Sequence, residues 1–197
     1  APTSSRKYRA SAIGVAKAMA LGYDTLACSS TGNAASSLAG ACASVGLRAI
    51  IFVPETAPAA KVAQLRAFGA SVFLVQGTYG AAFHLCQTAV KHYNWYNRNC
   101  AINPYLVEGK KTCGHEIAEQ CHDSPPDVVA IAVGDGCCIS GVHKGMEEMR
   151  QLDVWRGQPR MLGVQAMGAA PIVRAFDDGK ALVPVQAQTV ADSICVG

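Results

Sequence analysis

The sequence predicts an α/β protein in two lobes, each with a parallel sheet and crossover helices. Three observations support this fold class. Short apolar runs alternate with helical stretches from residue 11 to residue 93, and a turn glycine separates them. A polar and aromatic segment, residues 93–99, then interrupts the alternation. Strands resume after it. Strand and helix alternation of this kind is typical of parallel sheets, because parallel neighbours need a helical crossover.

In the first lobe, glycines divide the helices from the strands. Apolar residues at helical spacing precede Gly22 and Gly46, where a left-handed cap would end each helix. Pro58 begins another helix, which Gly69 closes. The apolar runs between these helices are suited to strands buried on both faces. These runs are Thr25–Cys28, Arg48–Val53 and Ser71–Val75.

The second lobe is predicted to begin near the polar segment. A helix is expected over Val107–Cys121, and Pro125-Pro126 precedes a strand over Val128–Val133. A glycine-rich turn leads into a helix from Ile139 to Leu152, and a last strand covers Met161–Gln165. The chain contains no internal repeat.

Composition excludes several classes of function. Half of the 197 residues are apolar and only 7% are aromatic, so we expect a core of Ala, Val, Leu and Ile. Seventeen basic residues against fourteen acidic ones give a net charge of +3, too small and dispersed for a nucleic-acid partner. No apolar run approaches the roughly 20 residues of a membrane span, and no signal peptide is evident. We therefore expect a soluble, cytoplasmic protein without a membrane partner.

Cysteine and histidine patterns do not predict a metal site. The nine cysteines form an odd count without C-x-x-C spacing, which favours buried free thiols. His115 and His122 are seven residues apart and lack a third ligand nearby. The cysteines are Cys28, Cys42, Cys86, Cys100, Cys113, Cys121, Cys137, Cys138 and Cys195.

The loop over residues 134–141, GDGCCISG, follows a predicted strand and opens a helix. Small residues at this position let backbone N–H groups approach an anion at the helix N-terminus, where the helix dipole also favours negative charge. A phosphate group fits this description. A purely structural glycine turn is the alternative, and Cys137 and Cys138 could instead be redox-active thiols.

A second loop, SSTGN at residues 29–33, has the same placement after a strand. Simple N-capping of the next helix is its alternative explanation. Two such loops, one in each lobe, suggest a cleft for a ligand with phosphate and carboxylate ends. Lys7 lies in a third candidate segment, PTSSRKYR at residues 2–9.

Taken together and in this order, the three segments resemble the fold-type II pyridoxal-phosphate (PLP) enzymes, and among them most closely the threonine synthase family. In that family the corresponding motifs are P-T-x-S-F-K-D-R, S-T-G-N and a glycine-rich phosphate loop. Arg6 and Tyr8 differ from the family's Phe and Asp. The resemblance spans nearly the whole chain, because four further segments between residues 103 and 171 also match. They are NPY at residues 103–105, EGKKT at 108–112, RMLGVQ at 160–165 and GAAP at 168–171.

The resemblance implies a role for each site residue. Lys7 would carry PLP as an imine and move protons between substrate carbons. Asn33 would contact the cofactor's phenolic oxygen. The substrate carboxylate would be bound by Ser30, Thr31, Gly32 and Asn33. The cofactor phosphate would be bound, chiefly through backbone amides, by Gly134, Asp135, Gly136, Cys137 and Cys138.

The resemblance also implies a domain plan and a function. Residues 1–10 would form the cofactor-lysine segment, 11–97 the smaller domain and 98–197 part of the larger one, with the fold incomplete at both ends. The reaction would convert O-phosphohomoserine and water to threonine and phosphate, and the resemblance also implies a homodimer. The second hypothesis is ammonia-lyase or β-replacement chemistry on a small amino acid. The third hypothesis is a degenerate, non-catalytic paralogue or fragment.

Overall fold

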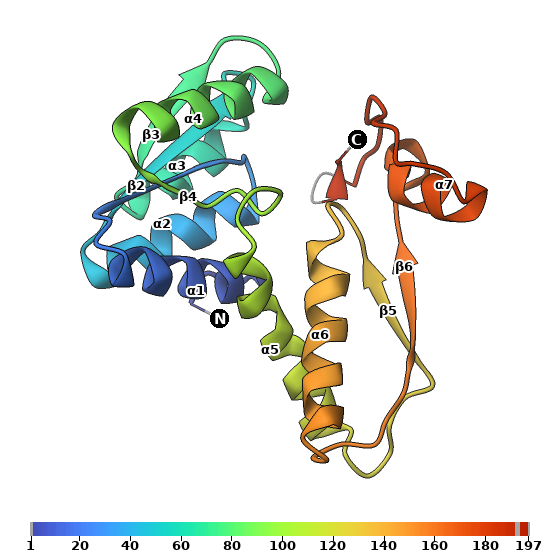
Figure 1. Ribbon diagram of the computed structural model, residues 1–197. Coiled ribbons are helices and arrows are strands. Elements are labelled where there is room, and N and C mark those ends of the chain that lie inside the picture. Colours follow the sequence, from blue (N-terminus) through green and yellow to red (C-terminus); the bar gives the residue numbers. More distant parts are fainter. Residues whose placement is uncertain (1, 192–193, 197) are drawn as a thin grey trace. The chain divides into compact units, whose positions relative to one another are not determined.

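The computed structural model describes residues 2–191 and 194–196. The chain divides into two compact units, Ala1–Gly109 and Lys110–Gly197 (Figure 1). The division falls inside the helix Tyr105–Gln120. The expected domain bounds, 11–97 and 98–197, stay a prediction. Each unit is built on its own parallel sheet.

The first unit contains a four-stranded sheet in the order β3-β2-β1-β4. Every neighbouring pair is parallel, and the register places Thr25 beside Arg48 and Ile50 beside Ser71. The predicted α/β class with parallel strands is therefore confirmed. The strands are β1 (Thr25–Ser29), β2 (Arg48–Pro54), β3 (Ser71–Val75) and β4 (Tyr96–Asn97).

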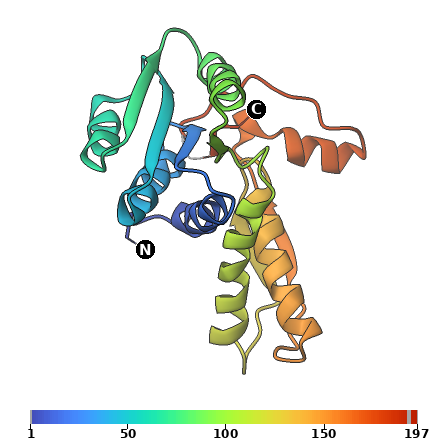
Figure 2. The same ribbon diagram turned by 60° about the vertical axis from the view of Figure 1, so that its left-hand side comes forward.

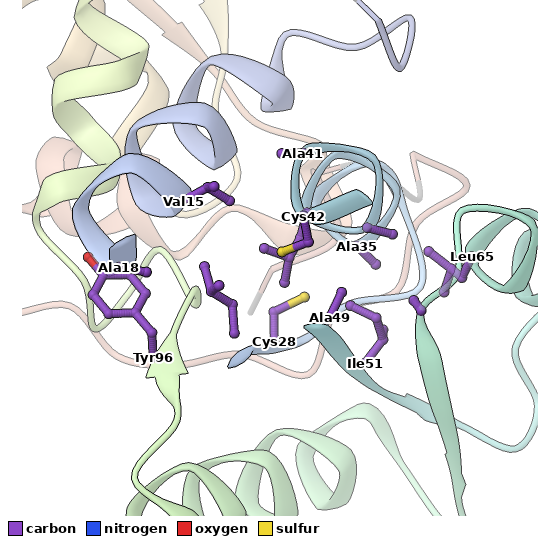
Figure 3. Close-up of a cluster of buried hydrophobic side chains, with 14 of the residues drawn as sticks. Val15, Ala18, Cys28, Ala35, Ala41, Cys42, Ala49, Ile51, Leu65 and Tyr96 are labelled. Atoms are coloured by element: carbon purple, nitrogen blue, oxygen red, sulfur yellow. The ribbon is translucent and has the colours of Figure 1, made fainter. Parts of the chain in front are cut away.

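Helices cover both faces of this sheet. Side chains of α1, α2 and α3 pack on one face, against Leu26, Cys28 and Ile51 (Figure 3). Side chains of α4 pack on the other face, against Ala27 and Phe52. Alternate residues of the strands Thr25–Ser29 and Arg48–Pro54 thus enter two separate cores. The helices are α1 (Lys7–Ala20), α2 (Asn33–Val45), α3 (Ala59–Ala67) and α4 (Tyr79–Tyr93).

Strand β3 departs from the expectation that all these strands are buried on both faces. Phe73 is 51% exposed and Leu74 is 50% exposed. The reason is position, because β3 is the edge of the sheet and α4 packs over β1 and β2. The prediction of two-sided burial is therefore wrong for β3.

All nine cysteines are free, but only three of them are buried. Burial raises the pKa of the Cys28 and Cys42 thiols to about 12 and that of Cys86 to about 11. These three side chains belong to the two cores of the first unit. They act there as small apolar residues.

The second unit holds a two-stranded parallel sheet, in which Val128 lies beside Arg160. Helix α5 starts in the first unit and continues through the division without a break (Figure 2). The elements are α5 (Tyr105–Gln120), β5 (Val128–Ala132), α6 (Cys137–Gln151), β6 (Arg160–Val164), the short 3₁₀ helix η1 (Met167–Ala169) and α7 (Pro171–Asp178).

Within the second unit, two glycines allow α5 and α6 to approach closely. A Cβ atom added to Gly114 would collide with the Val142 carbonyl oxygen, and one added to Gly145 would collide with that of Lys111. Ile131, Met146 and other apolar side chains fill the core of this unit. No helix within residues 2–191 and 194–196 combines the length and apolar character that crossing a bilayer requires.

Candidate functional site

Lys7 is the first residue of α1 and is half-buried. Its backbone N–H donates to the Ser5 hydroxyl at 3.2 Å, and the N–H of Tyr8 bonds to the Ser5 carbonyl at 3.1 Å. The preceding segment lies against α2, because a Cβ atom added to Gly40 would stand 2.6 Å from Thr3 Cγ2. The candidate lysine is therefore held at a defined helix start.

The second candidate segment connects β1 to α2. The N–H of Gly32 donates to the Ser30 hydroxyl at 3.2 Å, and Gly32 is the N-cap residue of α2. Glycine has no side chain that could cap the helix, so the explanation of this loop as capping by Ser, Thr or Asn is not supported. A Cβ atom at Gly32 would meet nothing within 4 Å. The turn thus offers open space at a helix N-terminus, where a carboxylate is electrostatically favoured.

A hydrogen bond links the two helices that begin at these segments. The hydroxyls of Ser11 and Ser37 lie 2.9 Å apart, and each serine stands four residues, about one helical turn, after Lys7 or Asn33. The Arg98 side chain, only 2% exposed, donates to the same Ser11 oxygen. The first unit therefore holds the starts of α1 and α2 in a fixed register.

The third candidate segment lies in the second unit, between β5 and α6. Gly136 has φ 77° and is the N-cap residue of α6, without a side-chain cap. The N–H of Cys137 donates to the Asp135 carboxylate at 3.1 Å. The first N–H groups of a helix have no acceptor inside that helix, so they can bind an anion.

Apolar side chains lie close to both glycines of this loop. A Cβ atom at Gly134 would lie 3.3 Å from Val196 Cγ2, and one at Gly136 would lie 3.5 Å from Ile172 Cδ1. A larger residue at either position would crowd these neighbours. The glycines and the helix N-terminus fit the phosphate group of PLP, although the charge of Asp135 opposes it.

The first unit contains Lys7 and the serine turn, which is the loop over residues 29–33. Residues 134–138 belong to the second unit. Their assignment to one ligand stays a prediction. Within the described ranges, no three His, Cys, Asp or Glu side chains cluster as metal ligands.

The structure also reveals three polar side chains that the sequence patterns did not single out. Asn99 accepts the Ser29 N–H at 3.0 Å, and Tyr79 donates to the Ser29 carbonyl at 3.2 Å. In the second unit, Gln165 donates to the Gly134 carbonyl at 3.3 Å and accepts the Val173 N–H at 2.9 Å. All three bind the backbone of the candidate loops. Of the three, Gln165 alone belongs to a segment matched in the sequence, RMLGVQ at residues 160–165, and that match gave it no role.

Comparison with known proteins identifies the family. The family model described as "Pyridoxal-phosphate dependent enzyme" matches residues 1–197. The chain belongs to this family. Threonine synthase from Methanosarcina acetivorans is 39% identical over all of this chain, which covers 49% of that protein. Threonine synthase from Methanocaldococcus jannaschii is 37% identical with the same coverage. The resemblance to threonine synthases is confirmed, and the chain spans about half the length of these relatives.

Two solved structures share the fold. Processed threonine deaminase isoform 2 from Solanum lycopersicum superposes with a TM-score of 0.86 at 25% identity, over 98% of this chain and 52% of that chain. A fungal L-serine ammonia-lyase from Rhizomucor miehei also gives 0.86, at 20% identity, over 100% of this chain and 61% of that chain. The second likeness shows the fold alone.

Proposed function

We propose that the protein carrying this chain is a PLP-dependent lyase that converts O-phosphohomoserine and water to threonine and phosphate. The observation that carries the proposal is the similarity to threonine synthases along all of the chain. The proposed assembly is a homodimer. When bound, PLP supplies the electron sink for this chemistry, and the protein supplies binding, orientation and proton transfer.

The geometry of the first unit supports roles for Lys7 and the serine turn. The Lys7 amine, at the start of α1, would hold the cofactor covalently and transfer protons at the α carbon of the substrate. The substrate carboxylate would lie at the N-terminus of α2, where the helix dipole favours it. Ser30, Thr31, Gly32 and Asn33 supply the groups of that turn, and Asn33 would also contact the ring of the cofactor.

The second unit supports a role in phosphate binding. Glycines at 134 and 136 let the backbone come close to an anion, and the first turn of α6 points N–H groups toward it. Asp135 and Cys138 would contribute their backbone N–H groups. The Cys137 N–H, which donates to the Asp135 carboxylate, would do so once the phosphate displaces that carboxylate. Gln165 would keep this loop attached to the start of α7.

Reductive trapping tests the cofactor part of the proposal. The whole protein, incubated with PLP, should show a visible absorption band that borohydride removes, leaving the reduced cofactor on the Lys7 peptide. Lys7→Ala should lose both the band and the label. Lys17→Ala should keep both, because Lys17 lies on the same helix but stacks on Tyr105. An unlabelled wild-type protein would favour the non-catalytic alternative.

Product analysis tests the reaction. Phosphate release from O-phosphohomoserine, with threonine as the co-product, is the expected result. The likeness to threonine deaminase at 25% identity favours ammonia-lyase chemistry as the second candidate. Release of ammonia from threonine or serine, without phosphate release from O-phosphohomoserine, would replace the first proposal by the second.

A further inference from the structure

We propose that Asn99 and Tyr79 are positioning residues that set the substrate-binding turn through the backbone of Ser29. This inference rests on the proposed function, because it takes residues 30–33 as the carboxylate-binding turn. Neither side chain is placed in contact with the substrate. Their effect is carried by the residue that immediately precedes the turn.

The two side chains extend a ladder that the short strand β4 leaves incomplete. Strand β4 has two residues, and the Arg98 N–H adds one more bond to the Ala27 carbonyl at 2.8 Å. The Ser29 N–H is then bound by the Asn99 side-chain oxygen at 3.0 Å, instead of by a backbone carbonyl. The Ser29 carbonyl accepts the Tyr79 hydroxyl at 3.2 Å. Both backbone groups of Ser29 are therefore bound by side chains.

Asn99 is itself held in one orientation. It is 6% exposed, and its side-chain nitrogen donates to Asn97 Oδ1 at 2.9 Å and to Cys86 Sγ at 3.6 Å. Asn97 is oriented in turn, because its own nitrogen donates to Gln87 at 2.8 Å. Since the amide nitrogen of Asn99 faces these acceptors, its oxygen must face Ser29. This chain of hydrogen bonds fixes the position of Ser29, at the C-terminal end of β1.

The position of the turn over residues 30–33 depends on these hydrogen bonds to Ser29. Gly32 caps α2 without a side-chain hydrogen bond, and the bond from Gly32 to Ser30 is internal to the turn. Displacement of Ser29 would therefore move the hydroxyl and amide groups of the turn together. Because the turn would bind the carboxylate equally in the ground state and the transition state, the loss should fall on KM more than on kcat.

Tyr79→Phe and Asn99→Leu test the inference in the whole protein. Tyr79 is 53% exposed, so its Phe variant keeps the fold even where Asn99→Leu does not. We expect Tyr79→Phe to raise KM for O-phosphohomoserine about threefold and Asn99→Leu about tenfold, with kcat changed by less than about twofold. Tyr93→Phe is the matched control, because Tyr93 lies on the same helix and stacks on Trp95. It should change neither constant.

Hydrogen exchange supplies a readout that does not need catalysis. Tyr79→Phe should speed amide exchange over residues 30–33 and leave residues 48–54 of β2 unchanged. Faster exchange in a protein that lacks the proposed activity would uphold the positioning network and reject the proposed function alone. Unchanged exchange together with an unchanged KM would overturn the inference. A fall in kcat at constant KM would also overturn it, because that is the result of a smaller folded fraction.

Discussion

The carboxylate of Glu148 lies 2.8 Å from the ammonium group of Lys111, which joins α6 to α5 in the second unit. Its other oxygen lies 3.0 Å from His115 Nε2. The hydrogen bond from Lys111, aided by the one from His115, holds the pKa of Glu148 below its ordinary value. Part of the stability of this helix pair therefore depends on an ionised carboxylate.

Removing Lys111 should flatten the acid dependence of stability. A carboxyl group whose folded pKa is depressed stabilises the fold above its unfolded pKa, about 4.3, and loses that contribution as the pH falls through the folded pKa. In Lys111→Met, the urea midpoint should therefore fall less between about pH 6 and about pH 3 than in the wild type. Lys91→Met, an exposed change on α4, should keep the wild-type slope. Equal slopes for wild type and Lys111→Met would contradict the expectation.

Gly145→Ala should destabilise the second unit. The added Cβ would collide with the Lys111 carbonyl oxygen, which is backbone and cannot move without shifting a helix. We expect a loss of about 2 kcal/mol or more in the free energy of unfolding, measured by urea titration. Gly80→Ala on α4 is the control, because its Cβ would make only an ordinary 3.5 Å contact and alanine favours a helix. Equal stability of the two variants would contradict the close packing of α5 against α6 at Gly145.

Asp135→Asn should strengthen phosphate binding at the glycine loop. The asparagine keeps the oxygen that accepts the Cys137 N–H, but it removes a negative charge from the anion site. Inorganic phosphate is the probe, and calorimetry at fixed pH and ionic strength should show an affinity about threefold to tenfold higher than that of the wild type. Asp153→Asn lies beyond the other end of α6 and should have no effect. Weaker binding in Asp135→Asn would mean that the carboxylate assists the site.

Ser29→Ala should stabilise the first unit. The Ser29 hydroxyl is buried and has no hydrogen-bond partner among the described residues. The bonds to Asn99 and Tyr79 use its backbone, so alanine retains them. Removing an unsatisfied buried hydroxyl should raise the free energy of unfolding by about 1 kcal/mol. Ser44→Ala, which removes a hydroxyl that is bonded to the Ala41 carbonyl, should not raise it. A loss of stability in Ser29→Ala would reveal an unseen partner.

Glycine positions made several helix ends predictable from the sequence. Gly22, Gly46 and Gly69 all have positive φ, as the predicted left-handed helix ends require. The start of α1 was not predictable, because its N-cap residue, Arg6, makes no side-chain capping hydrogen bond and is not a typical N-cap residue type. The exposure of β3 was also unreadable, since the order of strands in a sheet is not encoded in any local pattern.

The candidate loops were predictable because each combines its residues within a few positions at the end of a strand. Asn99 and Tyr79 were not, because they act on a residue 70 or 50 positions away. Such contacts exist only after the sheet and α4 have assembled. Asn99 lies in a connecting segment and Tyr79 at an exposed helix start. Polar residues at such places are otherwise indistinguishable from solvated ones.

The three buried thiols of the first unit make its unfolding chemically visible. Attack on an alkylating reagent requires the thiolate, which Cys28, Cys42 and Cys86 do not form near neutral pH while they are buried. A brief pulse of maleimide would therefore add mass at these positions only in molecules whose sheet has opened. Mass spectrometry of that pulse gives the open fraction directly, without a dye, a tag or an engineered cysteine.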